Sequence, residues 1–105
     1  MLLRTLTPHM HLIGSTFEVE LLQPDGERLP LLTIPAWDVN WQISYSFRDP
    51  PLARAGSRIL VRATFDNRSE NPSNAYPGRT VRDGPQIWDE MLILVVEWVF
   101  PRQEP

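Results

Sequence analysis

The sequence predicts an all-β protein, an antiparallel β-sandwich of the jelly-roll kind that forms a single domain. Eleven prolines are spread through 105 residues, which opposes long helices because proline lacks the backbone donor that a helix interior needs. Several segments instead alternate apolar and polar residues, as strands with one buried face do. A chain of this length builds one hydrophobic core. We expect residues 1–105 to be one domain of a longer protein, because strand-like sequence begins almost at Met1.

Three segments show the alternation most clearly. Residues 17–21 place Phe, Val and Leu on one face, and residues 59–65 place Ile, Val, Ala and Phe on one face. Residues 39–47 do the same with Val, Trp, Ile, Tyr and Phe, so we expect a long strand there. The last strand, residues 91–100, begins with apolar residues on both faces. We therefore expect it to lie centrally and to be covered on both sides.

Turn residues stand between these segments. The Pro-Asp-Gly sequence at 24–26 predicts a tight hairpin between strands at 17–22 and 28–34, because proline presets φ and glycine accepts a positive φ. A long loop rich in Asn, Pro, Ser and Gly follows at 67–86. A loop of this length in so small a domain usually carries a function or covers another part of the molecule.

The composition excludes several function classes. There is no cysteine, so disulfides, thiolate zinc sites and cysteine nucleophiles are ruled out. All ten basic residues are arginines scattered along a chain of net charge -3, which argues against a nucleic-acid partner. No apolar run approaches the roughly 18 residues of a spanning helix, so we expect no membrane insertion.

The only two histidines, His9 and His11, flank Met10. On a strand, residues two apart point to the same face with Cβ atoms about 6–7 Å apart. Two imidazoles so placed can converge on one metal ion about 2 Å from each ring. Met10 then points to the opposite face, where we expect it to join the core. The simpler alternative is a pair of surface histidines that bind no metal.

Two imidazoles need a further ligand to make a tight site. Met91, Asp89, Glu90 and the carboxylates of the long loop are all candidates, and a Met91 buried in the core is the simpler alternative. Two imidazoles and a thioether form a neutral, soft set that suits Cu(I) and leaves a coordination position open. Two imidazoles and a carboxylate suit zinc or non-haem Fe(II) instead. The residues permit both sets.

The motifs at the two ends of the chain, taken together, resemble a known family. They stand in the order Pro8-His9-Met10-His11, Gly14, and then Trp88-Asp89-Glu90-Met91 at the start of an apolar final strand. This pattern, over about residues 5–100, resembles the C-terminal domain of copper type II ascorbate-dependent monooxygenases. Peptidylglycine α-hydroxylating monooxygenase and dopamine β-monooxygenase belong to that family. The resemblance implies a jelly-roll sandwich with copper on His9, His11 and Met91, and with Asp89 and Glu90 shaping the turn before Met91.

The resemblance also implies a function. The domain would be the oxygen-binding half of a copper monooxygenase-like protein, taking electrons from another domain of a larger redox protein outside the cytoplasm, in the periplasm or beyond. Its small partners would be O₂ or a small-molecule substrate. The family's second copper needs three further histidines that are not in this sequence, and Thr7 and Val95 stand where the peptide-amidating members carry Arg and Tyr. The domain alone should therefore not complete catalysis. The alternative is a copper-holding, copper-transfer or partner-binding sandwich.

Overall fold

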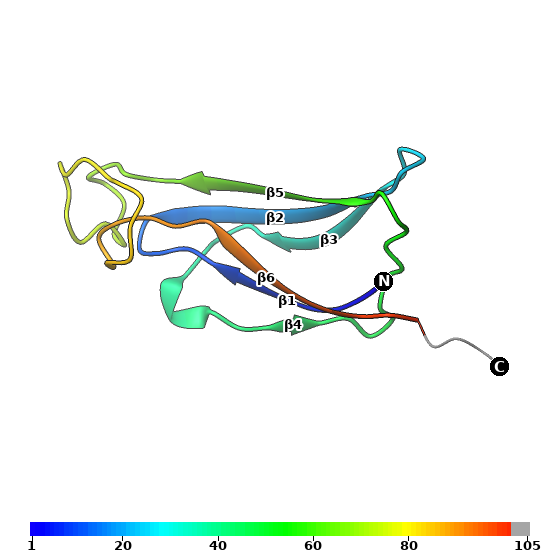
Figure 1. The fold of residues 1–105 in the computed structure, drawn as a ribbon. Helices are drawn as coiled ribbons and strands as arrows, with labels where there is room; N and C mark the ends of the chain where they lie inside the picture. The colour runs from blue at the N-terminus through cyan, green and yellow to red at the C-terminus, as the bar shows by residue number, and fades with distance from the viewer. Residues whose placement is uncertain (102–105) are drawn as a thin grey trace.

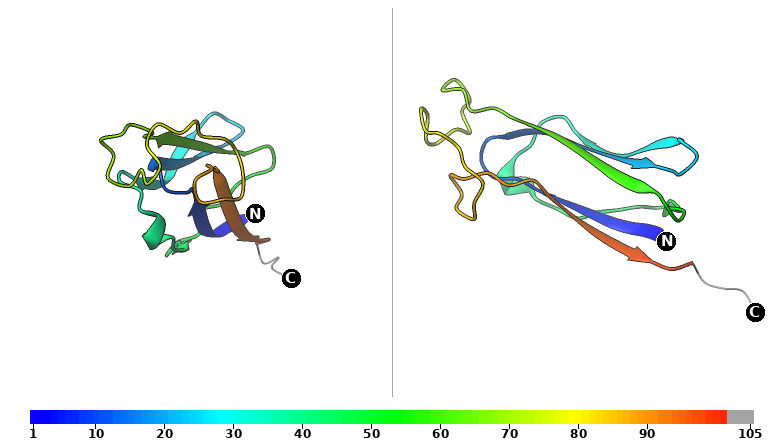
Figure 2. Two further views of the ribbon diagram at one scale, coloured as in Figure 1. Left: turned by 90° about the vertical axis from the view of Figure 1, so that its left-hand side faces the viewer. Right: turned by 45° about the horizontal axis from the view of Figure 1, so that its top comes forward.

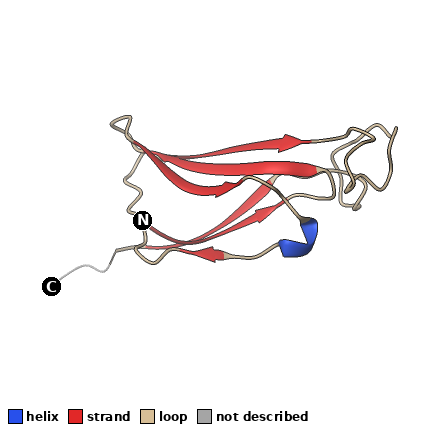
Figure 3. Cartoon of the chain, turned by 180° about the vertical axis from the view of Figure 1, so that it is seen from behind, coloured by secondary structure: helices blue, strands red, loops and turns tan. Residues whose placement is uncertain are grey.

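The computed structural model describes residues 1–101, and this part of the chain is built from strands and loops with one short 3₁₀ turn (Figures 1 and 3). The elements, in chain order, are β1 (Leu2–His9), β2 (Gly14–Leu22), β3 (Arg28–Ile34), η1 (Val39–Trp41), β4 (Tyr45–Ser46), β5 (Arg58–Phe65) and β6 (Ile93–Val99). No helix in residues 1–101 is long and apolar enough to span a membrane.

The strands form two antiparallel three-stranded sheets with the orders β4-β1-β6 and β3-β2-β5. The two sheets lie face to face along the length of the molecule (Figure 2). β1 is the central strand of one sheet and β2 of the other, and a short turn after His9 joins them. The predicted all-β sandwich is thus confirmed, whereas the jelly-roll connectivity stays a prediction.

The core lies between the two central strands. Its buried side chains alternate along β2, as a half-buried strand requires, and along β1 they alternate from Leu6 onward, after an irregularity between Leu3 and Thr5. They are Leu3, Leu6, Pro8 and Met10 from β1 and the turn after it, and Phe17, Val19 and Leu21 from β2. The alternation predicted for residues 17–21 is confirmed, and so is the burial of Met10 away from the two histidines.

Two of the predicted connections are also confirmed. β2 and β3 pair as an antiparallel hairpin whose turn contains Gly26 at a φ of +92°. The long loop predicted at residues 67–86 is present and extends further, from the end of β5 at Phe65 to the start of β6 at Ile93. It folds back on itself, because Asp83 forms a parallel bridge with Glu90.

The predicted strand at residues 39–47 is wrong. Val39–Trp41 forms the 3₁₀ turn η1, and only Tyr45–Ser46 pairs with β1. The side chain of Asp38 accepts a hydrogen bond from the backbone N–H of Asn40, and this local bond competes with strand pairing. Trp41 is 73% exposed, so the apolar alternation of this segment does not mark a buried face.

The prediction for the last strand is wrong in its position. β6 pairs with β1 on one side only and so lies at the edge of its sheet. Val95 is 57% exposed, whereas Leu94 and Val96 pack partly buried against the core. An apolar sequence indicates that a strand favours burial, but it does not identify the element that buries it.

Gly14, the first residue of β2, is required by close packing. A Cβ at this position would lie 2.8 Å from Cδ1 of Trp37 and 3.0 Å from Cβ of Met10. Trp37 cannot easily move, because its indole Nε1–H donates to the carbonyl oxygen of His11 at 3.1 Å. We expect Gly14→Ala to lower the free energy of unfolding by about 1–3 kcal/mol, as overpacking does.

Urea denaturation of Gly14→Ala measures this loss, with Gly26→Ala as the control. No atom would lie within 4 Å of a Cβ on Gly26, so the positive φ is the only source of strain in Gly26→Ala. A left-handed conformation costs an alanine about 1 kcal/mol. A wild-type unfolding midpoint for Gly14→Ala would contradict the close packing of Gly14 against Trp37.

Candidate metal site at the ends of strands β1 and β6

His9 and His11 are brought together where β1 ends and the chain turns into β2. Their ring centroids are 5.1 Å apart and the ring planes are almost perpendicular, at 83°. A metal about 2.1 Å from one nitrogen of each ring would lie about 3.2 Å from each centroid. At a tetrahedral angle the two centroids would then be about 5.2 Å apart. The observed centroid spacing of 5.1 Å matches this value.

A hydrogen bond from His9 to Gln42 determines the tautomer of His9. Nδ1 of His9 bonds Oε1 of Gln42, whose Nε2 donates to the carbonyl oxygen of Val39 at 3.1 Å and so turns Oε1 toward the ring. An amide oxygen only accepts, so Nδ1 of His9 carries the proton. In the neutral ring Nε2 then has a free lone pair, which is the form that binds a metal.

His11 is held in the same tautomer by the backbone. Its Nδ1 donates to the carbonyl oxygen of Asp89 at 3.0 Å, which again leaves the lone pair on Nε2. The residue is 5% exposed, and its own backbone is fixed on both sides. Its N–H donates to Oε1 of Glu90 at 2.8 Å, and its carbonyl oxygen accepts from Trp37. Both imidazoles are thus oriented by partners before any metal binds.

Glu90 connects the turn between β1 and β2 to the segment that leads into β6. Its buried carboxylate accepts three backbone N–H groups, from His11 at 2.8 Å, Ile13 at 3.0 Å and Met91 at 3.3 Å. These bonds hold residues 89–91 against the turn between β1 and β2. Both carboxylate oxygens are occupied by backbone donors, so Glu90 is a structural residue here and not a metal ligand.

The neighbouring carboxylate is also turned to the backbone. Oδ2 of Asp89 accepts the N–H of Gln86 at 3.2 Å and lies beside Gly84. Across residues 1–101, no three or more His, Cys, Asp or Glu side chains gather in a metal-binding arrangement. The geometry therefore gives no support to the zinc or Fe(II) alternative, which needs a carboxylate beside the two imidazoles.

Met91 lies in the segment that leads into β6. The β1–β6 ladder pairs Pro8 with Leu94 and His9 with Ile93, one residue forward on β1 for each residue back on β6. The pairing ends at His9 and Ile93, and the segment before β6 is joined to His11 through the Asp89 carbonyl and the Glu90 carboxylate. Met91 itself lines a shallow surface depression with Phe65 and Val81. Met91 is only partly buried and does not belong to the core, unlike Met10.

Two residues that contribute to this site, Gln42 and Trp37, were not predicted from the sequence. Gln42 is 33 residues from His9, on the segment that was mistaken for a strand. Trp37 is 26 residues from His11. Neither residue has a local sequence signal, because each reaches the histidines through a loop whose path only the folded sandwich defines.

The contact between Gln42 and His9 leads to a prediction. Replacing the hydrogen-bond partner of a metal-binding histidine typically costs 10–100-fold in metal affinity. We expect Gln42→Ala to weaken Cu(I) binding by about 10-fold, because Nδ1 of His9 loses its acceptor and the ring its orientation. Competition titration against a chromogenic chelator measures the change. Gln23→Ala, whose amide bonds the 52–57 loop at the other end of the sandwich, should leave the Cu(I) affinity unchanged.

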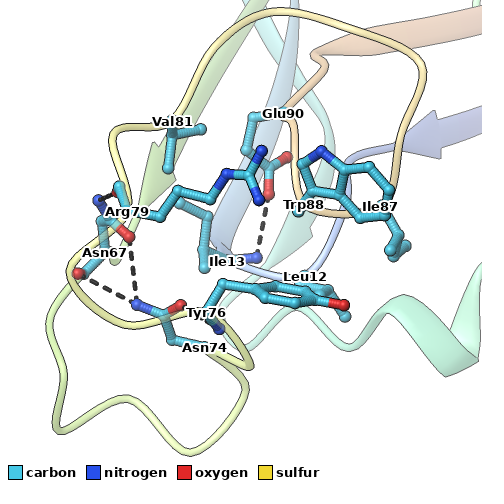
Figure 4. A pocket seen from close by; sticks show the side chains of 10 residues that line it. All are labelled: Leu12, Ile13, Asn67, Asn74, Tyr76, Arg79, Val81, Ile87, Trp88 and Glu90. Atoms are coloured by element: carbon cyan, nitrogen blue, oxygen red, sulfur yellow. Dashed lines mark hydrogen bonds between the residues drawn. The ribbon is translucent and has the colours of Figure 1, made fainter.

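The long loop packs over the other side of Glu90 (Figure 4). The guanidinium of Arg79 lies 5.4 Å from the ring centroid of Trp88, and Tyr76 contacts the same indole edge-on at 6.0 Å. The cavity left between these side chains and Glu90 is about 10 Å³, which is room for one water molecule at most. The loop therefore covers the carboxylate and leaves no ligand pocket beneath it.

The chain matches no protein-family model, no curated protein and no solved structure in the three comparisons made. The resemblance to copper monooxygenases therefore stays a prediction, and the candidate site rests on the geometry of His9, His11 and the segment around Met91.

Proposed function

We propose that the protein binds one copper ion through His9, His11 and Met91 and serves as the oxygen-binding half of a larger monooxygenase-like redox protein. One observation carries this proposal. Both imidazoles donate their Nδ1 proton to a fixed oxygen acceptor, and their rings stand at the spacing that two ligands of one ion require.

The ligand set favours copper in its reduced state. Two neutral imidazoles and a thioether add no negative charge, and soft sulfur ligands select Cu(I). Three protein ligands leave a coordination position for O₂ or a small substrate, and the copper would supply the redox chemistry when bound. The protein's part is to hold the two rings in place with Gln42, the Asp89 carbonyl and the Glu90 carboxylate. Electrons would come from another domain, in a periplasmic or extracellular protein.

A copper-holding or copper-transfer module is the second candidate. The partial exposure of His9 and Met91 favours it, because an ion at the end of the sandwich is within reach of a partner protein. Reactivity with O₂ separates the two functions. A catalytic half-domain should lose its bound Cu(I) to air oxidation, with a Cu(II) electron paramagnetic resonance signal. A holding module should keep Cu(I) reduced in air for hours.

The test of binding is an anaerobic Cu(I) titration in competition with a chromogenic chelator. We expect one ion per chain, and we expect Met91→Leu to weaken the affinity by about 10-fold through loss of the soft sulfur ligand. Met10→Leu is the matched control. Met10 is fully buried in the core, on the face away from the histidines, so the same substitution there should leave the affinity unchanged.

Two results would overturn the proposal. One is no Cu(I) binding by the wild-type protein. The other is an equal affinity in wild type, Met10→Leu and Met91→Leu together with tighter binding of zinc. In the second case the thioether is not a ligand, and the histidine pair belongs to a harder metal site.

A further inference from the structure

The outer edge of β6 differs from the other sheet edges of the molecule. Within residues 1–101 no strand pairs with it, so its backbone N–H and C=O groups on that side lack strand partners. Proteins normally protect such edges with proline, positive charge, a bulge or a very short strand, because an open edge invites another strand to pair with it.

The three other edge strands carry such protection. β3 contains Pro30, and β5 carries Arg58 and Arg62. β4 is only two residues long. β6 has seven residues with the sequence Ile-Leu-Val-Val-Glu-Trp-Val, without proline or positive charge and with Glu97 as its one charged residue. It is the long, apolar edge that natural sequences avoid unless it is covered.

Apolar side chains at and around this edge are also open to solvent. Their exposed fractions run from 37% to 76%, and they are Leu92, Ile93, Val95, Trp98, Val99 and Phe100. The two aromatic residues among them, Trp98 and Phe100, alone expose on the order of 250 Å² together, because an aromatic side chain presents about 150–250 Å² when fully open. A stable interface buries about 800 Å² on each partner. The edge backbone and its neighbours can supply the remainder.

We propose that β6 is a dimerisation edge, on which a second copy of this chain pairs its own β6 antiparallel about a two-fold axis. The two β4-β1-β6 sheets then join into one continuous six-stranded sheet. An extended strand is the partner that unpaired backbone groups recognise, and closed two-fold pairing is the commonest form of homo-oligomer. This proposal does not depend on the copper site.

The face of the sheet on which each β6 side chain lies determines the register in which two copies of β6 can pair. Leu94 and Val96 face the core, and in an antiparallel pair directly opposite residues share a face. A two-fold axis at Val96 keeps the core-facing residues of both copies on one side and uses the whole strand. It pairs Ile93 with Val99 and Leu94 with Trp98 of the second copy. It also sets Val95 opposite Glu97 of the second copy, once in each half of the dimer, so no like charges meet.

This register predicts opposite effects for two charges at one position. Val95→Glu places a carboxylate opposite Glu97 of the second copy twice, whereas Val95→Lys places an ammonium group there twice. Like charges directly opposite destabilise a strand pair, and unlike charges stabilise it. By sedimentation velocity over a concentration series, we expect wild type and Val95→Lys to form dimers. We expect the dimer dissociation constant of Val95→Glu to be at least about 10-fold higher than that of Val95→Lys.

Circular dichroism of both variants checks that each still folds. Val95 is 57% exposed on the outer face of its sheet, so neither charge has to enter the core. A wild-type protein that stays monomeric at every concentration would overturn the dimer. Equal weakening by Glu and Lys would overturn the pairing about Val96, because that result needs an interface in which residue 95 does not face Glu97.

Discussion

His11→Ala is expected to lower the Cu(I) affinity by well over about 100-fold while the sandwich stays folded. The loss should exceed the 10–100-fold that follows from removing a hydrogen-bond partner of a metal ligand, because a ligand itself is removed. The fold should survive because the contacts that anchor residue 11 belong to its backbone. Its N–H still donates to Glu90, and its carbonyl oxygen still accepts from Trp37.

The side chain of His11 also makes a hydrogen bond, from Nδ1 to the carbonyl oxygen of Asp89. Its loss costs about 1 kcal/mol, or a fall in Tm of about 4–8 °C for a domain of this size. Competition titration and thermal denaturation on the same sample separate the two effects. Unchanged copper binding by a folded His11→Ala protein would show that the copper lies elsewhere.

Glu90→Ala is expected to have the largest effect on stability. The buried carboxylate is the acceptor for three backbone N–H groups, and each buried donor left without a partner costs about 1–3 kcal/mol. We expect a loss of about 3–5 kcal/mol, a large part of the total free energy of unfolding of a small domain. The copper affinity should fall as well, because the Asp89 carbonyl and Met91 are held in place through the same carboxylate.

Urea denaturation of Glu90→Ala and of a matched glutamate variant measures this effect. Glu18 lies on β2 with its side chain half exposed and ion-paired to Arg62 at 3.6 Å. Surface ion pairs contribute about 0–1 kcal/mol, so Glu18→Ala should unfold near the wild-type midpoint. Equal losses of unfolding free energy in the two variants would mean that the carboxylate of Glu90 does not hold the segment before β6 against the turn between β1 and β2.

Local patterns in the sequence predicted the features that depend on local physics. The alternation at residues 17–21 identified a half-buried strand, and the Pro-Asp-Gly turn at 24–26 identified its hairpin. The two histidines could be placed together because residues two apart in extended chain share a face. The orientation of Met10 into the core follows from the same geometry.

The features that were missed depend on partners distant in sequence. The alternation at 39–47 resembles that at 17–21, yet the Asp38 cap and the edge position of this segment leave only two residues in a strand. The apolar composition of β6 indicated coverage on both sides, but the strand occupies an edge. Gln42 joins the candidate site because the loop after η1 passes beside His9, a path that no motif encodes.

The way the long loop closes has a consequence for how this protein can change in evolution. The backbone N–H of Glu90 donates to the carbonyl oxygen of Arg82 at 2.9 Å, and the N–H of Gly84 donates back to the carbonyl oxygen of Glu90 at 3.3 Å. These bonds close the loop beside the histidines, and within it residues 68–73 do not line the space over Glu90, whereas Tyr76 and Arg79 do. Doubling the length of a flexible loop costs only about 0.6 kcal/mol. Insertions in residues 68–73 should therefore be tolerated and could acquire new specificities while the geometry of the histidine pair is inherited unchanged.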